Sequence, residues 1–170
     1  NKGETESMGE FIVNGEVSDS DGTPVFDIDI KPSSLKYNLK EWTIQPSKIR
    51  IEGKNIEVDS FGAVSGEELV SLHGRTSDNP EDQISLYLER FSLDVVNSLL
   101  PNDLGVKGVL TGTATLTSPL STMNLSVDML CDSSYIANVP LGELRLGTRW
   151  NEEHEDFDIF ARNRLNGRSN

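Results

Sequence analysis

The chain is poor in cysteine, in positive charge and in long apolar runs, and each shortage excludes a class of protein. Its single cysteine, Cys131, rules out a disulfide within the chain, and we expect it to pack as a small buried apolar residue. Fifteen basic residues stand against 28 acidic ones, giving a formal charge of −13. That balance opposes binding to phosphate backbones, so we expect no nucleic-acid partner. No apolar run approaches the roughly 18 residues of a membrane-spanning helix.

Catalytic and metal-binding motifs are missing as well. His73 and His154 lie far apart, and neither has a cysteine, histidine or carboxylate at metal-ligand spacing. Asp19 and Asp21 precede Gly22, but the spacing departs from that of a calcium-binding EF-hand loop, which favours a plain acidic turn; adventitious calcium stays open. Nucleophile elbows, Cys–His signatures and phosphate loops are absent. We therefore expect no enzyme, no resident metal and no cofactor.

What the sequence does contain is a clear alternation of apolar and polar residues between positions 83 and 117. Ile84, Leu86 and Leu88 recur with the period of two that is typical of a half-buried strand. From Ser92 to Leu100 the apolar residues fall three and four apart, which predicts a short helix. The alternation then returns, and one face of the second strand holds small and apolar residues: Gly108, Leu110, Gly112, Ala114 and Leu116.

The remainder of the chain repeats the strand pattern in shorter segments. Turn residues such as Asp21-Gly22 and Gly53 separate these segments. Roughly ten short strands at regular spacing predict an all-β architecture. We expect residues 11–165 to form one β-rich domain, with residues 1–10 and 166–170 as frayed or linking ends. Because the apolar residues share one face, the sheet must curl, stack or close to cover it, and the alternation permits a trough, a sandwich or a barrel.

Three segments together resemble a known family. They are Arg90-Phe91-Ser92-Leu93, the run VKGVLTGTATLTSP from Val106 to Pro119, and the run PLGELRLGTRW from Pro140 to Trp150. In this order they are similar to the TamB family of AsmA-like envelope proteins, whose pattern has a strand, a short turn and helix, and a glycine-spaced strand ending near a proline. Ser118 stands where the family usually has glycine.

The resemblance implies a fold and a function. The fold is an elongated, curled, antiparallel-rich sheet, the trough called a β-taco, with one short helix near residues 92–100. The function is that of an internal or C-terminal piece of a periplasm-spanning, inner-membrane-anchored protein that carries phospholipid acyl chains along an apolar groove. Such a protein supports assembly of the outer membrane and its proteins, and so protein secretion, with an Omp85-type barrel as partner. The candidate groove residues are Ile84, Leu86, Leu88, Leu110, Ala114, Leu116, Leu125, Val127, Met129, Leu144 and Leu146.

An alternative stays open on the residues alone. A closed β-sandwich that binds glycan or protein through its loops satisfies the same alternation. The small residues Gly108, Gly112 and Ala114 fit both architectures, because they leave room for acyl chains in a trough and admit close backbone approach in a sandwich. The two readings differ in whether the apolar face is an open groove or a sealed core.

Overall fold

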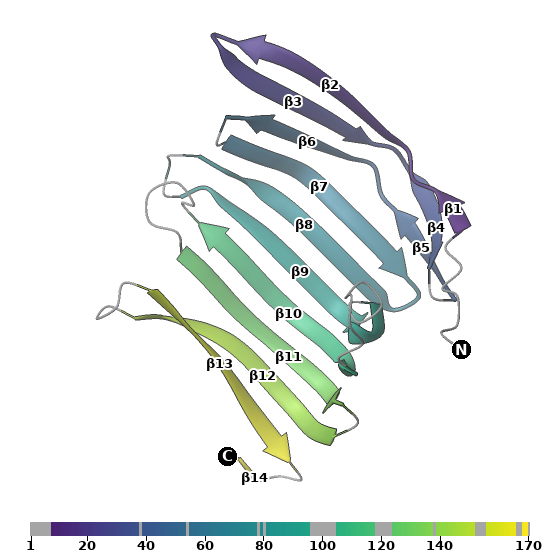
Figure 1. Ribbon diagram of the computed structural model, residues 1–170, viewed down its shortest axis with the longest axis vertical. Helices are drawn as coiled ribbons and strands as arrows, with labels where there is room; N and C mark the ends of the chain where they lie inside the picture. Colours follow the sequence, from purple (N-terminus) through teal and green to yellow (C-terminus); the bar gives the residue numbers. More distant parts are fainter. Residues whose placement is uncertain are drawn as a thin grey trace.

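The protein is a single antiparallel β-sheet of 14 strands (Figure 1). The computed structural model describes residues 8–37, 39–53, 55–77, 79, 81–95, 105–117, 124–137, 139–151, 156–165 and 168–169. The strands are β1 (Met8–Glu10), β2 (Val13–Ser20), β3 (Thr23–Ile30), β4 (Ser33–Tyr37), β5 (Lys40–Ile44), β6 (Ser47–Glu52), β7 (Asn55–Ser65), β8 (Glu68–Thr76), β9 (Gln83–Ser92), β10 (Lys107–Thr117), β11 (Asn124–Ile136), β12 (Val139–Asn151), β13 (Asp156–Leu165) and β14 (Arg168–Ser169).

Most of the sheet is a plain meander that forks once, at β7. The main path runs β2-β3-β6-β7-β8 and then in sequence order to β13. The first part of β7 pairs with β6, up to the pair of Val58 with Ile49, whereas its far end pairs with β5 through Ala63 and Val64. A register shift between Val58 and Phe61 separates the two parts. Such a bulge bends a strand, and β5, β4 and β1 branch from the main path beyond it.

Local chemistry places the turns where the sequence predicts them. Asp21 and Gly22 both have positive φ between β2 and β3, and the Gly22 amide donates a 2.9 Å hydrogen bond to the Asp19 carboxylate. Gly53 (φ 59°) ends β6, and Gly66 (φ 60°) lies between β7 and β8. Glycine adopts such backbone angles without a steric penalty, so these short connections fix the antiparallel order of the strands.

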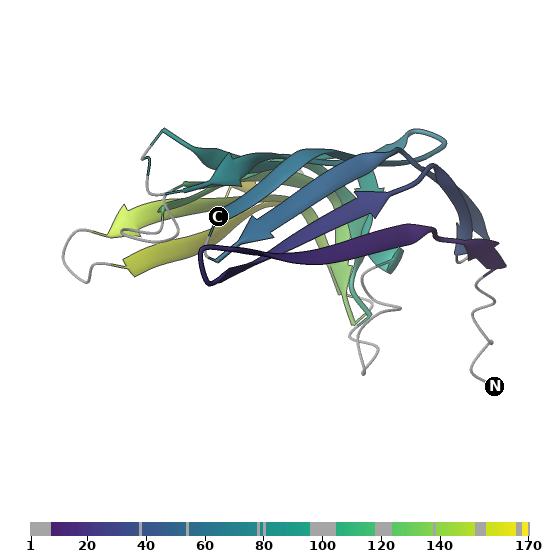
Figure 2. The same cartoon turned by 90° about the horizontal axis from the view of Figure 1, so that it is seen from above.

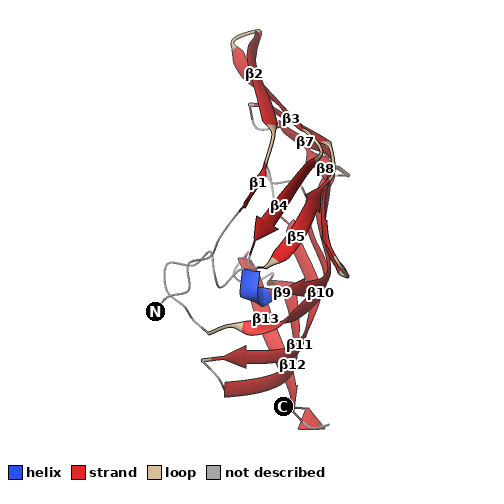
Figure 3. Ribbon diagram, turned by 90° about the vertical axis from the view of Figure 1, so that its right-hand side faces the viewer, coloured by secondary structure: helices blue, strands red, loops and turns tan. Residues whose placement is uncertain are grey.

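The sheet curls and stays open. Seen from its edge it is an arc, with β1, β4, β5 and the short helix on the concave side (Figure 3), and the view from above shows no second sheet facing it (Figure 2). The accessible surface is 11611 Å², against roughly 8,300 Å² for a compact monomer of this mass. The predicted all-β, curled antiparallel architecture is therefore confirmed, and the closed sandwich is not what the chain forms.

Two apolar clusters lie on the concave side. The first joins Trp42 and Ile44 of β5 to Ile30 and Ala63, each 6–7% exposed. The second is formed by Leu88, Leu110, Met129 and Cys131, each 2–8% exposed. Val70 and Phe91 pack against both clusters, and the Phe91 ring lies 6.2 Å from that of Trp42. Phe91 therefore links the branch strands to the main sheet.

Short strands lie in the segments that the sequence predicts as frayed or linking ends. Met8–Glu10 form β1, paired with β4, and Arg168–Ser169 form β14, paired with β13. The helix is described over residues 93–95; residues 96–100 of the predicted helix lie outside the described part of the chain.

Candidate functional site

The candidate groove residues lie side by side on the concave face. The cross-strand register joins them into rows that run perpendicular to the strands, at the usual spacing of about 4.8 Å. The rows are Ile84–Leu116–Leu125, Leu86–Ala114–Val127, Leu88–Gly112–Met129–Leu146 and Phe91–Leu110–Cys131–Leu144. Every candidate named from the sequence falls in one of these rows, because alternation with a period of two keeps one parity on one face.

The rows differ in how far solvent reaches them. Leu88, Leu110 and Met129 are 7–8% exposed, since their row neighbours and, from the helical end, Phe91 and Leu93 pack against their cluster. The first two rows, Ile84–Leu116–Leu125 and Leu86–Ala114–Val127, are half-buried throughout; we call them the open rows. Leu88, Leu110 and Met129, by contrast, are buried, and we call them the covered residues. Their place in a lipid groove stays a prediction.

The same face extends over the first half of the chain, where the sequence analysis named no groove residues. Ile28 of β3 lies opposite Ile49 of β6, and Ile49 lies opposite Val58 of β7. Further along, Phe61 of β7 and Leu72 of β8 form the next pair, and Leu72 lies opposite Leu86 of the open rows. Alternation of apolar and polar residues also identifies the inward side chains of these strands. It does not reveal which strands are neighbours, and therefore not that the apolar face continues from β3 to β9.

The glycines of β10 serve the backbone and not a cavity. A Cβ atom on Gly112 (φ 148°) lies 2.2 Å from the Asp128 carbonyl oxygen, and one on Gly108 lies 2.6 Å from the Cys131 sulfur. Both distances are far below van der Waals contact. These glycines therefore admit close approach of β11 within the sheet, and they do not widen a groove. Ala114 is the smallest side chain on the open rows.

An inward-facing ion pair closes the helical end of the concave face. Glu68, whose side chain is 13% exposed, pairs with Lys40 at the start of β5. The second Glu68 carboxylate oxygen accepts a 3.0 Å hydrogen bond from the Ser92 backbone amide, just before the helix. This hydrogen bond gives a partner to the backbone amide of the residue that precedes the helix. Glu68 of β8 is thereby linked to Lys40 of β5 and to the residue before the helix. These polar groups bound the apolar face at its helical end.

Cys131 lies beside Leu110 in the same row and is 2% exposed. Burial raises the pKa of the Cys131 thiol, and the negative charge of Asp132 raises it further. The thiol is therefore protonated at neutral pH and packs as an apolar group, as the sequence predicts. Because the thiolate is the nucleophilic form, Cys131 is not suited to covalent catalysis.

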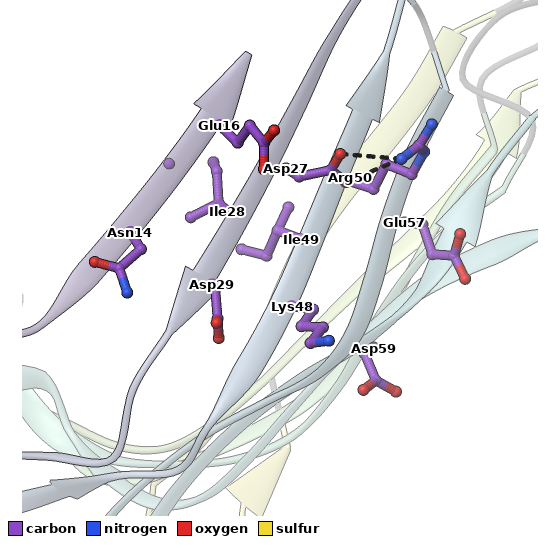
Figure 4. A pocket seen from close by; sticks show the side chains of 11 residues that line it. Asn14, Glu16, Asp27, Ile28, Asp29, Lys48, Ile49, Arg50, Glu57 and Asp59 are labelled. Atoms are coloured by element: carbon purple, nitrogen blue, oxygen red, sulfur yellow. Dashed lines mark hydrogen bonds and ion pairs between the residues drawn. The ribbon is translucent and has the colours of Figure 1, made fainter. Parts of the chain in front are cut away.

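The convex face carries alternating charges. A hollow of about 670 Å³ lies over β2, β3, β6 and β7, between polar rows that include Glu16, Asp27, Arg50 and Glu57 (Figure 4). Arg50 donates to both oxygens of the Asp27 carboxylate, at 3.0 and 3.1 Å. Such exposed ion pairs contribute at most about 1 kcal/mol each. The hollow is bounded by solvent-exposed charges, of which Asp27, Asp29 and Arg50 form ion pairs.

The described residues contain no cluster of three or more metal-binding side chains, and the Asp19 carboxylate is hydrogen-bonded within its own turn. In the same residues, no helix has the length and apolarity needed to cross a membrane. No family model, no curated protein and no solved structure matches this chain. The geometry of the concave face is thus the observation from which a function has to be argued.

Proposed function

We propose that this chain is a segment of a TamB-like envelope protein that carries phospholipid acyl chains along the concave face of its sheet. The observation that carries the proposal is a continuous apolar face on an open sheet. From Phe61 on β7 to Val127 on β11, each residue of one row is apolar and only half-buried, so solvent reaches the whole row. At about 4.8 Å per strand, this row extends roughly 19 Å.

The energetics suit a ligand made of hydrocarbon. Burying one methylene group stabilises a complex by about 0.8 kcal/mol when the group is fully covered. A chain of about 15 methylenes that is half covered therefore gains roughly 6 kcal/mol, before the cost of immobilising it. Such binding needs no catalytic residue and no directional hydrogen bond. It also lets the chain slide, because every position along the row is apolar and none forms a directional contact.

The polar surroundings support the same reading. Glu68 and Lys40 bound the apolar face at its helical end, while the opposite face of the sheet carries ion pairs such as Arg145 with Asp128, 3.0 Å apart. An acyl chain is therefore confined to one face. The alternative function, recognition of glycan or protein by loops of a closed sandwich, loses its architectural basis in an open sheet, and no described loop gathers aromatic side chains.

The test is site-specific photo-crosslinking to lipid. A photoreactive amino acid is placed at Leu116 or Val127 on the open rows, and at Thr115 or Ser126 on the opposite face. Each protein is incubated with vesicles of phosphatidylethanolamine and phosphatidylglycerol, and adducts are identified by mass spectrometry. We expect lipid adducts at the two concave positions and at least tenfold fewer at the convex ones. Equal labelling of both faces, or no adduct at any position, contradicts the proposal.

A matched pair of substitutions separates obstruction from misfolding. Ala114→Trp places a bulky side chain between Leu86 and Val127, whereas Thr113→Trp adds the same side chain to the exposed opposite face. We expect Ala114→Trp to abolish crosslinking at Leu116 and Thr113→Trp to leave it unchanged. Circular dichroism confirms that both variants fold. A folded Ala114→Trp protein that labels as well as the unmodified chain removes the open rows as the binding site.

A further inference from the structure

Two hairpin turns at one end of the sheet expose apolar side chains. The β4–β5 turn carries Leu39, whose exposed fraction is 105%. The β11–β12 turn lies between Ile136 and Val139, which are 48% and 58% exposed. Both turns lie at the end of the sheet that also carries the short helix, which we call the helical end (Figure 1). Each turn thus leaves aliphatic surface in contact with water, where it gains nothing from the hydrophobic effect.

The backbone of these turns shows that the apolar residues do not serve the turns themselves. Each connection has two residues between its last strand pairs. Leu39 has a φ of 64° and Ala137 a φ of 49°, angles at which two-residue hairpins usually place glycine or asparagine. A bulky side chain with positive φ is a steric outlier. Leu39 is therefore both strained and exposed, and such outliers cluster at sites that bind ligands.

The residues behind the second turn suit a membrane–water interface. Tyr135 is 39% exposed and lies opposite Lys107 of β10, which is exposed as well. Tyrosine combines an apolar ring with a polar hydroxyl, and lysine an aliphatic stem with a charged head, so both settle at the level of lipid head groups. Ile136 and its partner Val139 lie nearer the turn. The order from the turn inward is thus aliphatic and then amphipathic, as in a hairpin whose tip enters a bilayer.

The spacing of the two turns favours a lipid surface over a protein partner. Five steps of the sheet (β5-β7-β8-β9-β10-β11) separate β5 from β11, which is about 24 Å along the sheet at about 4.8 Å per strand. The end of the sheet between them is charged, since Glu67 and Arg90 form a 2.9 Å ion pair whose side chains are 80% and 60% exposed. A protein interface of standard size is one contiguous contact with an apolar centre. A fluid bilayer instead accepts separate apolar side chains, while the charges between them stay among the head groups.

We propose that the helical end docks on the surface of a zwitterionic lipid bilayer, with Leu39, Ile136 and Val139 entering its interface. The opposite end of the sheet is unsuited to that contact, because its β2–β3 and β8–β9 turns carry the exposed carboxylates of Asp21 and Glu81. The formal charge of −13 disfavours anionic lipids, whose surface potential is negative. The proposal rests on the hairpin turns and not on the concave face, so it stands or fails independently of acyl-chain carriage.

Vesicle flotation tests the docking, with vesicles of phosphatidylcholine and phosphatidylethanolamine at physiological salt. We expect the unmodified chain to float with the vesicles. Leu39→Asn removes the apolar side chain from the first turn, and the double variant Ile136→Thr and Val139→Thr makes the second turn polar while keeping β-branched side chains. We expect each of the two to weaken binding about tenfold. Val17→Thr makes the same exchange at an aliphatic residue of β2 that is 67% exposed and lies outside these turns, and it leaves binding unaltered.

Two further measurements separate docking from misfolding and determine the orientation. Asparagine tolerates positive φ better than leucine does, so Leu39→Asn keeps or raises the Tm while it loses binding. A photoreactive amino acid at position 39 forms lipid adducts, and one at position 81, at the opposite end, forms few or none. The proposal is wrong if the unmodified chain does not float, if both turn variants float as well as it does, or if Val17→Thr weakens binding as much as they do. Binding through the concave face alone gives the second of these results, and equal labelling at positions 39 and 81 likewise overturns the proposal.

Discussion

Substituting aspartate at a covered position and at an open position of the same strand measures how the concave face is sealed. Leu110 and Leu116 both lie on β10 and both point to the concave side. Leu110 is 8% exposed and packs with Leu88, Met129 and Cys131, whereas Leu116 is half-buried. The two variants, Leu110→Asp and Leu116→Asp, have identical chemistry, so any difference between them reports the local environment.

The expected magnitude follows from burial. Removing a buried leucine side chain costs about 2–5 kcal/mol. A carboxyl without a partner at that place has a raised pKa, and holding it protonated at pH 7 costs about 4 kcal/mol, from a shift of roughly three pKa units. Leu110→Asp therefore loses about 6–9 kcal/mol, which is most or all of the stability of a typical domain. At Leu116 the carboxylate reaches water, so the loss is about 1–2 kcal/mol of apolar burial.

Urea unfolding followed by circular dichroism checks these values, with Leu110→Asn as the control for shape without charge. The sign of the pH effect is also fixed. A carboxyl whose folded-state pKa is raised destabilises the protein at high pH, so Leu110→Asp gains stability as the pH falls from 8 to 5, and Leu110→Asn does not. If the two aspartate variants lose free energies of unfolding that agree within about 1 kcal/mol, the distinction between the covered residues and the open rows is wrong.

Two further predictions test the backbone and the electrostatics. Gly112→Ala places a Cβ atom 2.2 Å from the Asp128 carbonyl oxygen and lowers the free energy of unfolding by roughly 2–4 kcal/mol, whereas Gly15→Ala, with no atom within 4 Å of its Cβ, changes it by less than about 0.5 kcal/mol; equal losses in urea titrations contradict the close approach of β11. The pKa of Asp82 is lowered from 3.8 by the Ser77 hydroxyl, which donates a 2.6 Å hydrogen bond, and by Arg75. The stabilisation from Asp82 is therefore complete above about pH 4 and is lost as the pH falls through the lowered pKa, so the difference in Tm between the unmodified chain and Asp82→Asn shrinks between pH 5 and pH 2.5; a constant difference contradicts this account.

The sequence by itself determined which residues share a face. Ile84, Leu86 and Leu88 have one parity, and a strand turns successive side chains to opposite sides, so no other arrangement keeps all three together. The same local rule placed the turns at Gly22 and Gly53, where positive φ is needed. These features depend on neighbours in the chain and can therefore be predicted without the fold. The lipid function, the envelope location and the partners rest on resemblance and stay predictions.

Only the tertiary structure decided what covers that face. Leu86 and Leu88 follow the same alternation, yet Leu88 is 7% exposed and Leu86 is half-buried. The difference arises because Phe91 and Leu93 pack against the cluster that contains Leu88. The sequence pattern does not encode the fork at β7 that brings Trp42 to Phe91. That fork depends on the pairing of strands distant in sequence, and alternation fixes the face of a strand but not its neighbour.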